Sequence, residues 1–340
     1  MPDLPPTRKL YREDSYQRSF EATVLAASEP YVILNQSLFY ATAGGQPHDE
    51  GALTSPQGRA QVIAVTAETG ARGDILKHQV TGVLPKVGDR VSGEIDWARR
   101  YRHMQRHSAQ HLLSQAFVRL NERFKTVSVT LSKADCDLDI EADLSLEVLE
   151  EVENLVNEVA YQNLKVTCFE VAEIERYPLR RAPKVSGKIR LVDMGGWELS
   201  ACGGTHVAQL AETLPIKILG KERVKGKLTR IYFRAGLEAL EDYALKHDMA
   251  QQSAMLLSSQ VADLPEKLAA LLGDLKEESI KRSQLEMRLA EQLAAGLIAE
   301  VKPILGHRAI CYALSAEDSH LASALAKRLI RHPKVMAALR

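Results

Sequence analysis

The sequence has 340 residues, of which 45% are apolar and 26% charged, and its formal net charge is zero. This size allows two or three domains with a substantial core, and the neutral total gives no general indication of nucleic-acid binding. The sequence has no run of 18 apolar residues and no basic stretch leading into an apolar one, so neither a membrane span nor a signal peptide is expected. Four scattered cysteines argue against a secreted disulfide scaffold and predict a reducing compartment, the cytoplasm.

The chain begins with a β-rich region. Residues from about 20 to 96 contain short runs of β-branched residues, separated by turn signals such as Gly44-Gly45. We expect a small barrel-like domain over residues 1–97. Its strands are predicted near Ala22–Leu25, Tyr31–Leu34 and Ala60–Val65.

A helical pattern of apolar residues follows from about 98 to 122. It places His107 and His111 one turn apart on one helix face. The mixture of elements that follows predicts a two-layer α/β domain over residues 98–235. Its remaining elements are expected to be a helix capped by Ser145 and strands at Val127–Leu131, Cys136–Ile140, Val166–Val171, Ile189–Met194 and Arg230–Phe233.

The last third of the sequence is mainly helical, and residues 236–305 are expected to form two long helices. Leu264, Leu268, Leu271 and Leu275 step by four, three and four residues, as in a coiled-coil seam. An intramolecular antiparallel hairpin and a homodimer through these helices both fit the pattern. Residues 306–340 predict one strand and one helix, a partial α/β piece. The fold class expected for the whole chain is α+β.

Charge is unevenly distributed along the chain. Between Arg176 and Arg234 there are 13 basic and 4 acidic residues, whereas residues 1–97 hold 9 basic and 12 acidic residues. The basic segment fits either a surface for a phosphate backbone or an ordinary solvated face.

Two pairs of metal-type ligands lie about ninety residues apart. His107 and His111 form the first pair, and Cys202 and His206 form the second. Each pair is spaced i, i+4, and Gly203 and Gly204 allow the backbone between the second pair to fold tightly. Three imidazoles and one thiolate suit Zn²⁺ in tetrahedral geometry.

Two alternatives stay open for this site. Cys202 fits a nucleophile with a histidine base as well as a metal ligand, although a zinc-bound thiolate is a poorer nucleophile. Four protein ligands are also typical of a closed structural zinc, whereas catalytic zinc keeps one position open.

The run Phe39-Tyr40-Ala41-Thr42-Ala43-Gly44-Gly45-Gln46-Pro47 resembles the glycine-rich motif of alanyl-tRNA synthetase editing regions and of the free-standing AlaX trans-editing proteins. In those families His-x-x-x-His and then Cys-x-x-x-His follow it, as they do here. The resemblance covers residues of about 20 to 300 and fits the longer AlaX type. Threonyl-tRNA synthetase editing domains share the ligand pairs but neither the Gly-Gly-Gln motif nor the Gly-Gly-Thr insert. The sequence departs from the family pattern in two ways. It lacks the class II aminoacylation domain, so alanine activation is not expected, and it lacks a late C-terminal glycine-rich stretch.

The resemblance implies hydrolysis of mischarged tRNA(Ala), chiefly Ser-tRNA(Ala) and also Gly-tRNA(Ala), at a zinc ion held by His107, His111, Cys202 and His206. Thr42 would hydrogen-bond the serine hydroxyl, and Gln46 would hold water or an ester oxygen. The acceptor end of the tRNA would enter between the first two domains. Its phosphates would contact basic residues, for which we expect Arg99, Arg102, Arg181, Lys184, Lys221 and Lys225.

Two other functions compete with this interpretation. A non-enzymatic RNA-binding module with a structural zinc fits the closed ligand set and the basic segment. A zinc amidase or esterase for small molecules fits the ligand set, but it has no use for the basic segment.

Overall fold

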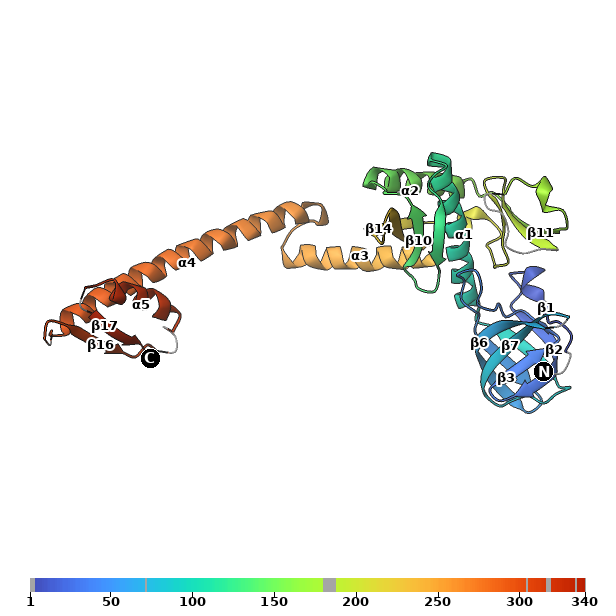
Figure 1. Ribbon diagram of the computed structural model, residues 1–340, viewed down its shortest axis with the longest axis horizontal. Coiled ribbons are helices and arrows are strands. Elements are labelled where there is room, and N and C mark those ends of the chain that lie inside the picture. Colours follow the sequence, from blue (N-terminus) through green and yellow to red (C-terminus); the bar gives the residue numbers. More distant parts are fainter. Residues whose placement is uncertain are drawn as a thin grey trace. The chain divides into compact units, whose positions relative to one another are not determined.

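A computed structural model describes residues 4–70, 72–179, 188–303, 305–315, 319–333 and 335–339. The chain divides into two compact units, Met1–Leu245 and Lys246–Arg340. The described residues form a mixed α/β structure with one closed six-stranded barrel and five α-helices (Figure 1). The predicted mixture of elements and the predicted small barrel are therefore confirmed, whereas the bounds of the four predicted domains stay predictions.

The barrel is the first part of the first unit. Its strands close in the order β2-β3-β7-β6-β5-β8, with bounds Ser19–Ser28, Tyr31–Leu34, Gly73–Gly82, Gly58–Gly70, Gly51–Ser55 and Arg90–Ile95. Alternate residues of β8 are buried, as expected for a strand with one face on the core. A side chain at Gly93 would lie 2.2 Å from the Phe20 ring, so glycine leaves room for that ring in the barrel core.

Short elements flank the barrel strands. Strand β1 (Arg8–Lys9) pairs in parallel with β4 (Gln36–Ser37), and the 3₁₀ helix η1 (Leu10–Arg12) follows β1 directly. Leu10 and Tyr11 are buried, and both belong to the barrel core. This anchoring fixes the position of Arg12, the last residue of η1.

The second part of the first unit has a four-stranded sheet covered by helices α1 (Trp97–Leu120) and α2 (Leu146–Tyr161). Asp96 caps α1 by accepting from the Arg99 backbone N–H, and Ser145 caps α2 as predicted. The core between helices and sheet contains Leu112, Phe117 and Val152. The sheet order is β14-β15-β10-β9, with bounds Ile216–Arg223, Leu228–Ala235, Cys136–Glu141 and Thr126–Thr130.

A small antiparallel sheet completes this unit. Its order is β11-β12-β13, with bounds Val166–Val171, Ile189–Met194 and Leu199–Ala201. Strand β11 has the predicted bounds, and β13 leads directly into Cys202. Two 3₁₀ helices flank this sheet, η2 (Ile174–Arg176) and η3 (Leu210–Thr213).

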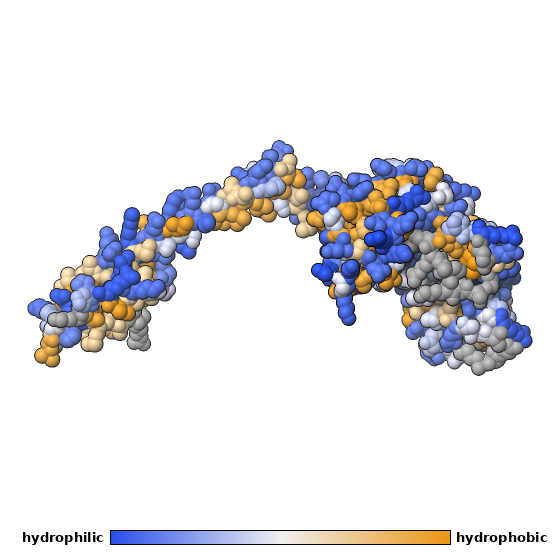
Figure 2. Space-filling view, turned by 45° about the horizontal axis from the view of Figure 1, so that its top comes forward, coloured by the Kyte–Doolittle hydropathy of each residue, from blue (hydrophilic) through white to orange (hydrophobic). Residues whose placement is uncertain are grey.

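Helix α3 (Leu237–Leu256) crosses the boundary between the two units, and α4 (Leu264–Glu300) belongs to the second, after η4 (Val261–Asp263). The two predicted long helices are confirmed. Asp263 precedes α4, and its side chain makes no capping hydrogen bond. Apolar side chains are exposed along α4 (Figure 2), among them Leu268, Leu271 and Leu275. The intramolecular hairpin and the homodimer through these helices both stay predictions.

A small α/β cluster ends the described chain. Strands β16 (Arg308–Tyr312) and β17 (Val335–Leu339) pair in parallel, and α5 (Ala322–Ile330) packs against the end of α4 after η5 (Ser319–Leu321). The predicted strand and helix are present, and β17 adds a strand that the sequence pattern did not predict. Among the described residues, no helix is both long and apolar enough to cross a membrane.

Candidate metal centre

Helix α1 and the loop after β13 bring four ligand side chains together. The candidate ligand atoms of His107, His111, Cys202 and His206 all lie within 4.8 Å of one another. The three imidazoles are buried, and Cys202 is partly buried. The i, i+4 spacing places the two α1 rings 5.1 Å apart, centroid to centroid. The structure thus joins two ligand pairs that lie about ninety residues apart in the sequence.

The distances within the cluster fit a tetrahedral ion. Cys202 Sγ lies 3.4 Å from His107 Nε2 and 3.3 Å from His206 Nε2. With zinc–nitrogen bonds of about 2.0 Å and a zinc–sulfur bond of about 2.3 Å, a tetrahedral site has a sulfur–nitrogen edge of about 3.5 Å. The residues present therefore fit a divalent metal ion with nitrogen and sulfur ligands.

In three of the candidate ligands, the histidines, the ring nitrogen Nδ1 faces away from the cluster and has a polar partner of its own. His107 Nδ1 donates to Gln46 Oε1 at 2.8 Å, and His111 Nδ1 donates to Glu198 Oε2 at 3.0 Å. Because these oxygens only accept, Nδ1 of each ring keeps a proton, and Nε2 is the nitrogen that can bind a metal ion. Ser108 Oγ lies 3.2 Å from His206 Nδ1. Such partners orient imidazole ligands and strengthen metal binding.

The glycines of the ligand loop permit a close approach. A Cβ atom at Gly204 would lie 2.2 Å from His107 Cε1, so any larger residue would displace that ring. The Gly204 backbone N–H donates to Cys202 Sγ at 3.4 Å. Arg190 of β12 holds the loop from outside, because its guanidinium donates to the carbonyls of Cys202 and Gly204 at 2.8 and 2.9 Å.

Burial and the neighbouring groups of the cluster shift the pKa values of its members. Burial alone would raise the pKa of the Cys202 thiol, but nearby His107 and His206 bring it well below its usual value. Burial, together with the charge of His107, lowers the pKa of His206 to about 3. For His111, burial lowers the pKa, but Glu198 and Cys202 together outweigh burial and raise the pKa to about 10. An ion binding here would meet a thiolate and displace a proton from His111.

Gln46 and Thr42 occupy different environments on the same loop. Gln46 is fully buried, and its amide oxygen also accepts from the Thr205 backbone N–H at 3.1 Å. Its amide nitrogen donates to Thr205 Oγ1 at 2.8 Å. The side chain predicted to hold water or ester is thus bonded to His107 and to the ligand loop. Thr42 is exposed, and its hydroxyl accepts from the His48 backbone N–H at 3.0 Å.

A buried ion pair ties this loop to α1. Arg100 and Asp49 are both fully buried, and the Arg100 guanidinium bonds Asp49 at 2.5–3.0 Å as well as the Leu38 carbonyl. Asp49 also accepts from the Tyr40 backbone N–H at 2.7 Å. Removing one member of such a pair leaves an uncompensated buried charge. Sequence reasoning missed Arg100, Asp49, Glu198 and Arg190, because no motif or spacing identifies the partner of any of the four.

The residues predicted to contact tRNA make different interactions in the structure. Arg99 donates to the His48 carbonyl, and Arg102 forms a two-pronged pair with Glu241 at 2.8 and 2.6 Å. Lys221 donates to the Leu144 carbonyl, and Lys225 is exposed. Arg181 and Lys184 lie outside the described residues. Contact of any of the six with tRNA stays a prediction.

Comparison with known proteins places these elements in a family. Residues 11–99 match the model for class II (A) tRNA synthetases. Residues 189–232, which include Cys202 and His206, match the model for the threonyl and alanyl tRNA synthetase second additional domain. Barrel, small sheet and ligand cluster therefore define a protein related to the editing portion of these synthetases.

The similarity extends over most of the chain. Alanine–tRNA ligases of Pyrococcus abyssi and Pyrococcus furiosus are each 33% identical over 312 residues, covering 89% of this chain and 34% of the ligase. The ligase of Pyrobaculum aerophilum is 31% identical over 351 aligned residues, covering 96% of this chain and 37% of the ligase. The chain thus spans about a third of the length of these relatives. The predicted family is confirmed: the chain is an AlaX-like relative of alanyl-tRNA synthetase.

Proposed function

We propose that this protein acts in the cytoplasm on the acceptor end of mischarged tRNA(Ala), hydrolysing the ester of Ser-tRNA(Ala) and Gly-tRNA(Ala). The observation that carries the proposal is the cluster of His107, His111, Cys202 and His206, part of which lies in the region matching the second additional domain. A synthetase pocket sized for alanine cannot strongly reject glycine or serine, so a separate hydrolytic site is useful.

Zinc is the proposed ion, and when bound it would supply a Lewis acid that polarises an ester carbonyl or a water molecule. The chain itself supplies orientation. Gln46 and Glu198 hold two of the imidazoles in the tautomer that binds metal, and Arg190 holds the loop that carries Cys202. In the reaction, water adds to the ester carbonyl, the bond to the ribose oxygen breaks, and that oxygen leaves as a hydroxyl after gaining a proton.

Thr42 is the proposed selector for serine. The residue is exposed, and among the described residues its hydroxyl bonds only His48, within its own loop. A serine substrate would exchange this local partner for its own hydroxyl, whereas alanine offers no group to bond. The proposal thus assigns Thr42 to substrate choice and Gln46 to the support of His107.

The competing function is a non-enzymatic RNA-binding module. The observation that favours it is the closed set of four protein ligands, which is typical of structural zinc. The two functions differ in whether Ser-tRNA(Ala) turns over.

The deciding experiment measures release of amino acid from Ser-, Gly- and Ala-tRNA(Ala), with zinc content determined on the same samples. We expect release of serine and glycine well above the buffer rate and little release of alanine. Uncharged tRNA should compete, which would separate a tRNA deacylase from an esterase of small molecules. Tight tRNA binding without release of serine would support the binding module instead.

A further inference from the structure

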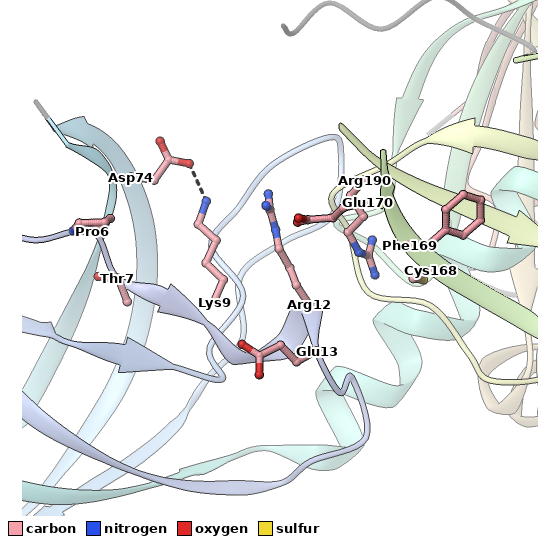
Figure 3. Close-up of a pocket in the computed structure, with 10 residues that line it drawn as sticks. All are labelled: Pro6, Thr7, Lys9, Arg12, Glu13, Asp74, Cys168, Phe169, Glu170 and Arg190. Carbon is pink, nitrogen blue, oxygen red and sulfur yellow. Dashed lines mark hydrogen bonds and ion pairs between the residues drawn. The ribbon is translucent and has the colours of Figure 1, made fainter. Parts of the chain in front are cut away.

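A second feature of the same unit is a pocket of about 640 Å³ beside the metal centre. It lies between the β1–η1 segment at the barrel and strands β11 and β12 of the small sheet, and Figure 3 shows the side chains that line it. The charged side chains among them are Lys9, Arg12, Glu13, Asp74, Glu170 and Arg190.

Two of the acidic groups are already neutralised. Lys9 Nζ bonds Asp74 at 2.6 Å, and Glu13 pairs with Arg8 at 2.7 Å. Arg12 differs, because it is exposed and makes no side-chain hydrogen bond or ion pair within the part of the chain that the structure describes. Figure 3 shows its guanidinium extending into the pocket between Lys9 and the β11–β12 strands.

Arg190 closes the opposite wall. It is 7% exposed, and its Nε is buried without a partner among the described residues, while one terminal nitrogen bonds the ligand loop. Glu170 lies opposite Arg190 in the β11–β12 register. No ion pair joins Glu170 to any described residue, so its carboxylate remains free to accept from a ligand.

The pocket adjoins the metal centre directly. A terminal nitrogen of Arg12 lies 3.7 Å from the position that a Cβ atom of Gly203 would take. Gly203 follows the ligand Cys202 in the chain. A ligand group bound by Arg12 would therefore lie next to the loop that holds the candidate metal ligands.

We propose that this pocket binds a ribonucleotide unit of the RNA 3′ end, with Arg12 bonding a phosphodiester oxygen and Glu170 accepting from a ribose 2′-hydroxyl. A planar guanidinium matches the oxygen geometry of phosphate, and a carboxylate can read the hydroxyl that distinguishes RNA from DNA. The inference rests on the proposed function, which it deepens by naming a binding site for the chain next to the ester. Arg12 binds and positions the substrate.

The first test uses binding of an uncharged single-stranded RNA ending in CCA, titrated at several salt concentrations. Arg12→Ala should weaken binding and reduce the slope of log affinity against log salt by about 0.7, the value for one lost phosphate contact on a single strand. Arg59→Ala is the matched control, because Arg59 is an exposed arginine of β6 that does not line the pocket. Equal slopes for the two variants would overturn the phosphate assignment.

The second test removes the acceptor oxygens of Glu170 and identifies the source of the phosphate. Glu170→Ala should reduce the preference for RNA over the matching DNA oligonucleotide on the order of tenfold. An unchanged preference would overturn the role of Glu170. If inorganic phosphate or AMP binds as tightly as the RNA and depends equally on Arg12, the pocket is a mononucleotide site and the RNA assignment is wrong.

Hydrolysis assays keep this inference separate from the proposed function. Arg12→Ala should raise KM for Ser-tRNA(Ala) and leave hydrolysis of 3′-O-seryl-adenosine, which has no phosphate, unchanged. If the unaltered protein releases serine but Arg12→Ala behaves identically on both substrates, the pocket assignment fails and the deacylase survives. If the protein binds RNA through Arg12 but never releases serine, the deacylase fails and the pocket survives.

Discussion

The metal centre and the Arg12 pocket are linked by Arg190 of β12, which lines the pocket and bonds the loop that carries Cys202, but they are built in opposite ways. In the centre, each histidine's outer nitrogen lies against a buried side chain, and the ligand atoms lie within 4.8 Å of one another. In the pocket, Arg12 is exposed and unpaired among the described residues. The centre is thus organised before a ligand arrives, whereas the pocket keeps Arg12 and Glu170 available. Mutations should therefore affect metal binding at the first site and substrate binding at the second.

The largest effect should follow the loss of a ligand. Cys202→Ala should lower zinc content and deacylation together. The loss should exceed the roughly 10- to 100-fold weakening that follows when a residue hydrogen-bonded to a metal ligand is removed. Elemental analysis and serine release would be measured on the same preparation, with Cys311→Ala, an exposed cysteine of β16, as the control. Full metal content with lost activity would instead assign Cys202 the role of nucleophile.

The next effect should come from the close approach of Gly204 to His107. Gly204→Ala would place a Cβ 2.2 Å from the imidazole and should displace it, weakening metal affinity at least about tenfold. Gly203→Ala is the matched control, since Arg12, at 3.7 Å, is the only described residue other than its chain neighbours within 4 Å of its Cβ. Competition with a chelating dye measures both affinities. Equal affinities in the two variants would contradict the geometry given for His107.

A comparable or smaller effect is expected from mutation of Gln46, which bonds His107. Gln46→Ala removes the acceptor for His107 Nδ1 and should weaken metal affinity by about 10- to 100-fold. Gln46→Glu retains an acceptor oxygen and should recover most of that affinity. If Gln46→Ala binds metal normally but loses hydrolysis, Gln46 contacts water or ester, as first predicted from the motif.

The smallest effect should be seen at Thr42, outside the buried centre. Thr42→Val should leave metal content and thermal stability unchanged, because the side chain is exposed and, within the described part of the chain, bonds only His48. It should lower the preference for Ser-tRNA(Ala) over Gly-tRNA(Ala) several-fold, through loss of one hydrogen bond. The ratio of the two kcat/KM values is the measurement, and an unchanged ratio would remove Thr42 from substrate choice.

Local patterns predicted the local geometry well. The apolar spacing after residue 98 predicts α1, and the i, i+4 rule then places His107 beside His111. Gly203 and Gly204 indicated a tight loop, and Gly204 is indeed where a Cβ would collide with His107. These features depend on residues within one or two turns of each other, so a single sequence is sufficient to predict them.

The same reasoning could not predict partners that lie far apart in the sequence. Glu198 supports His111 across 87 residues, and Asp49 neutralises Arg100 across 51 residues. Neither carboxylate has a spacing that identifies its partner, because tertiary folding alone brings them together. Gln46 was singled out by its motif, but its bond to His107 required the structure. The free guanidinium of Arg12 was missed for the same reason, since pairing decides which charges stay available.

The central claim is that one divalent ion is bound by three imidazoles and one thiolate. X-ray absorption at the zinc edge of the purified protein tests it most directly. The expected result is one zinc per chain with three nitrogen neighbours at about 2.0–2.1 Å and one sulfur neighbour at about 2.3 Å. A zinc shell without sulfur, or a protein that deacylates Ser-tRNA(Ala) while free of metal, would contradict the account.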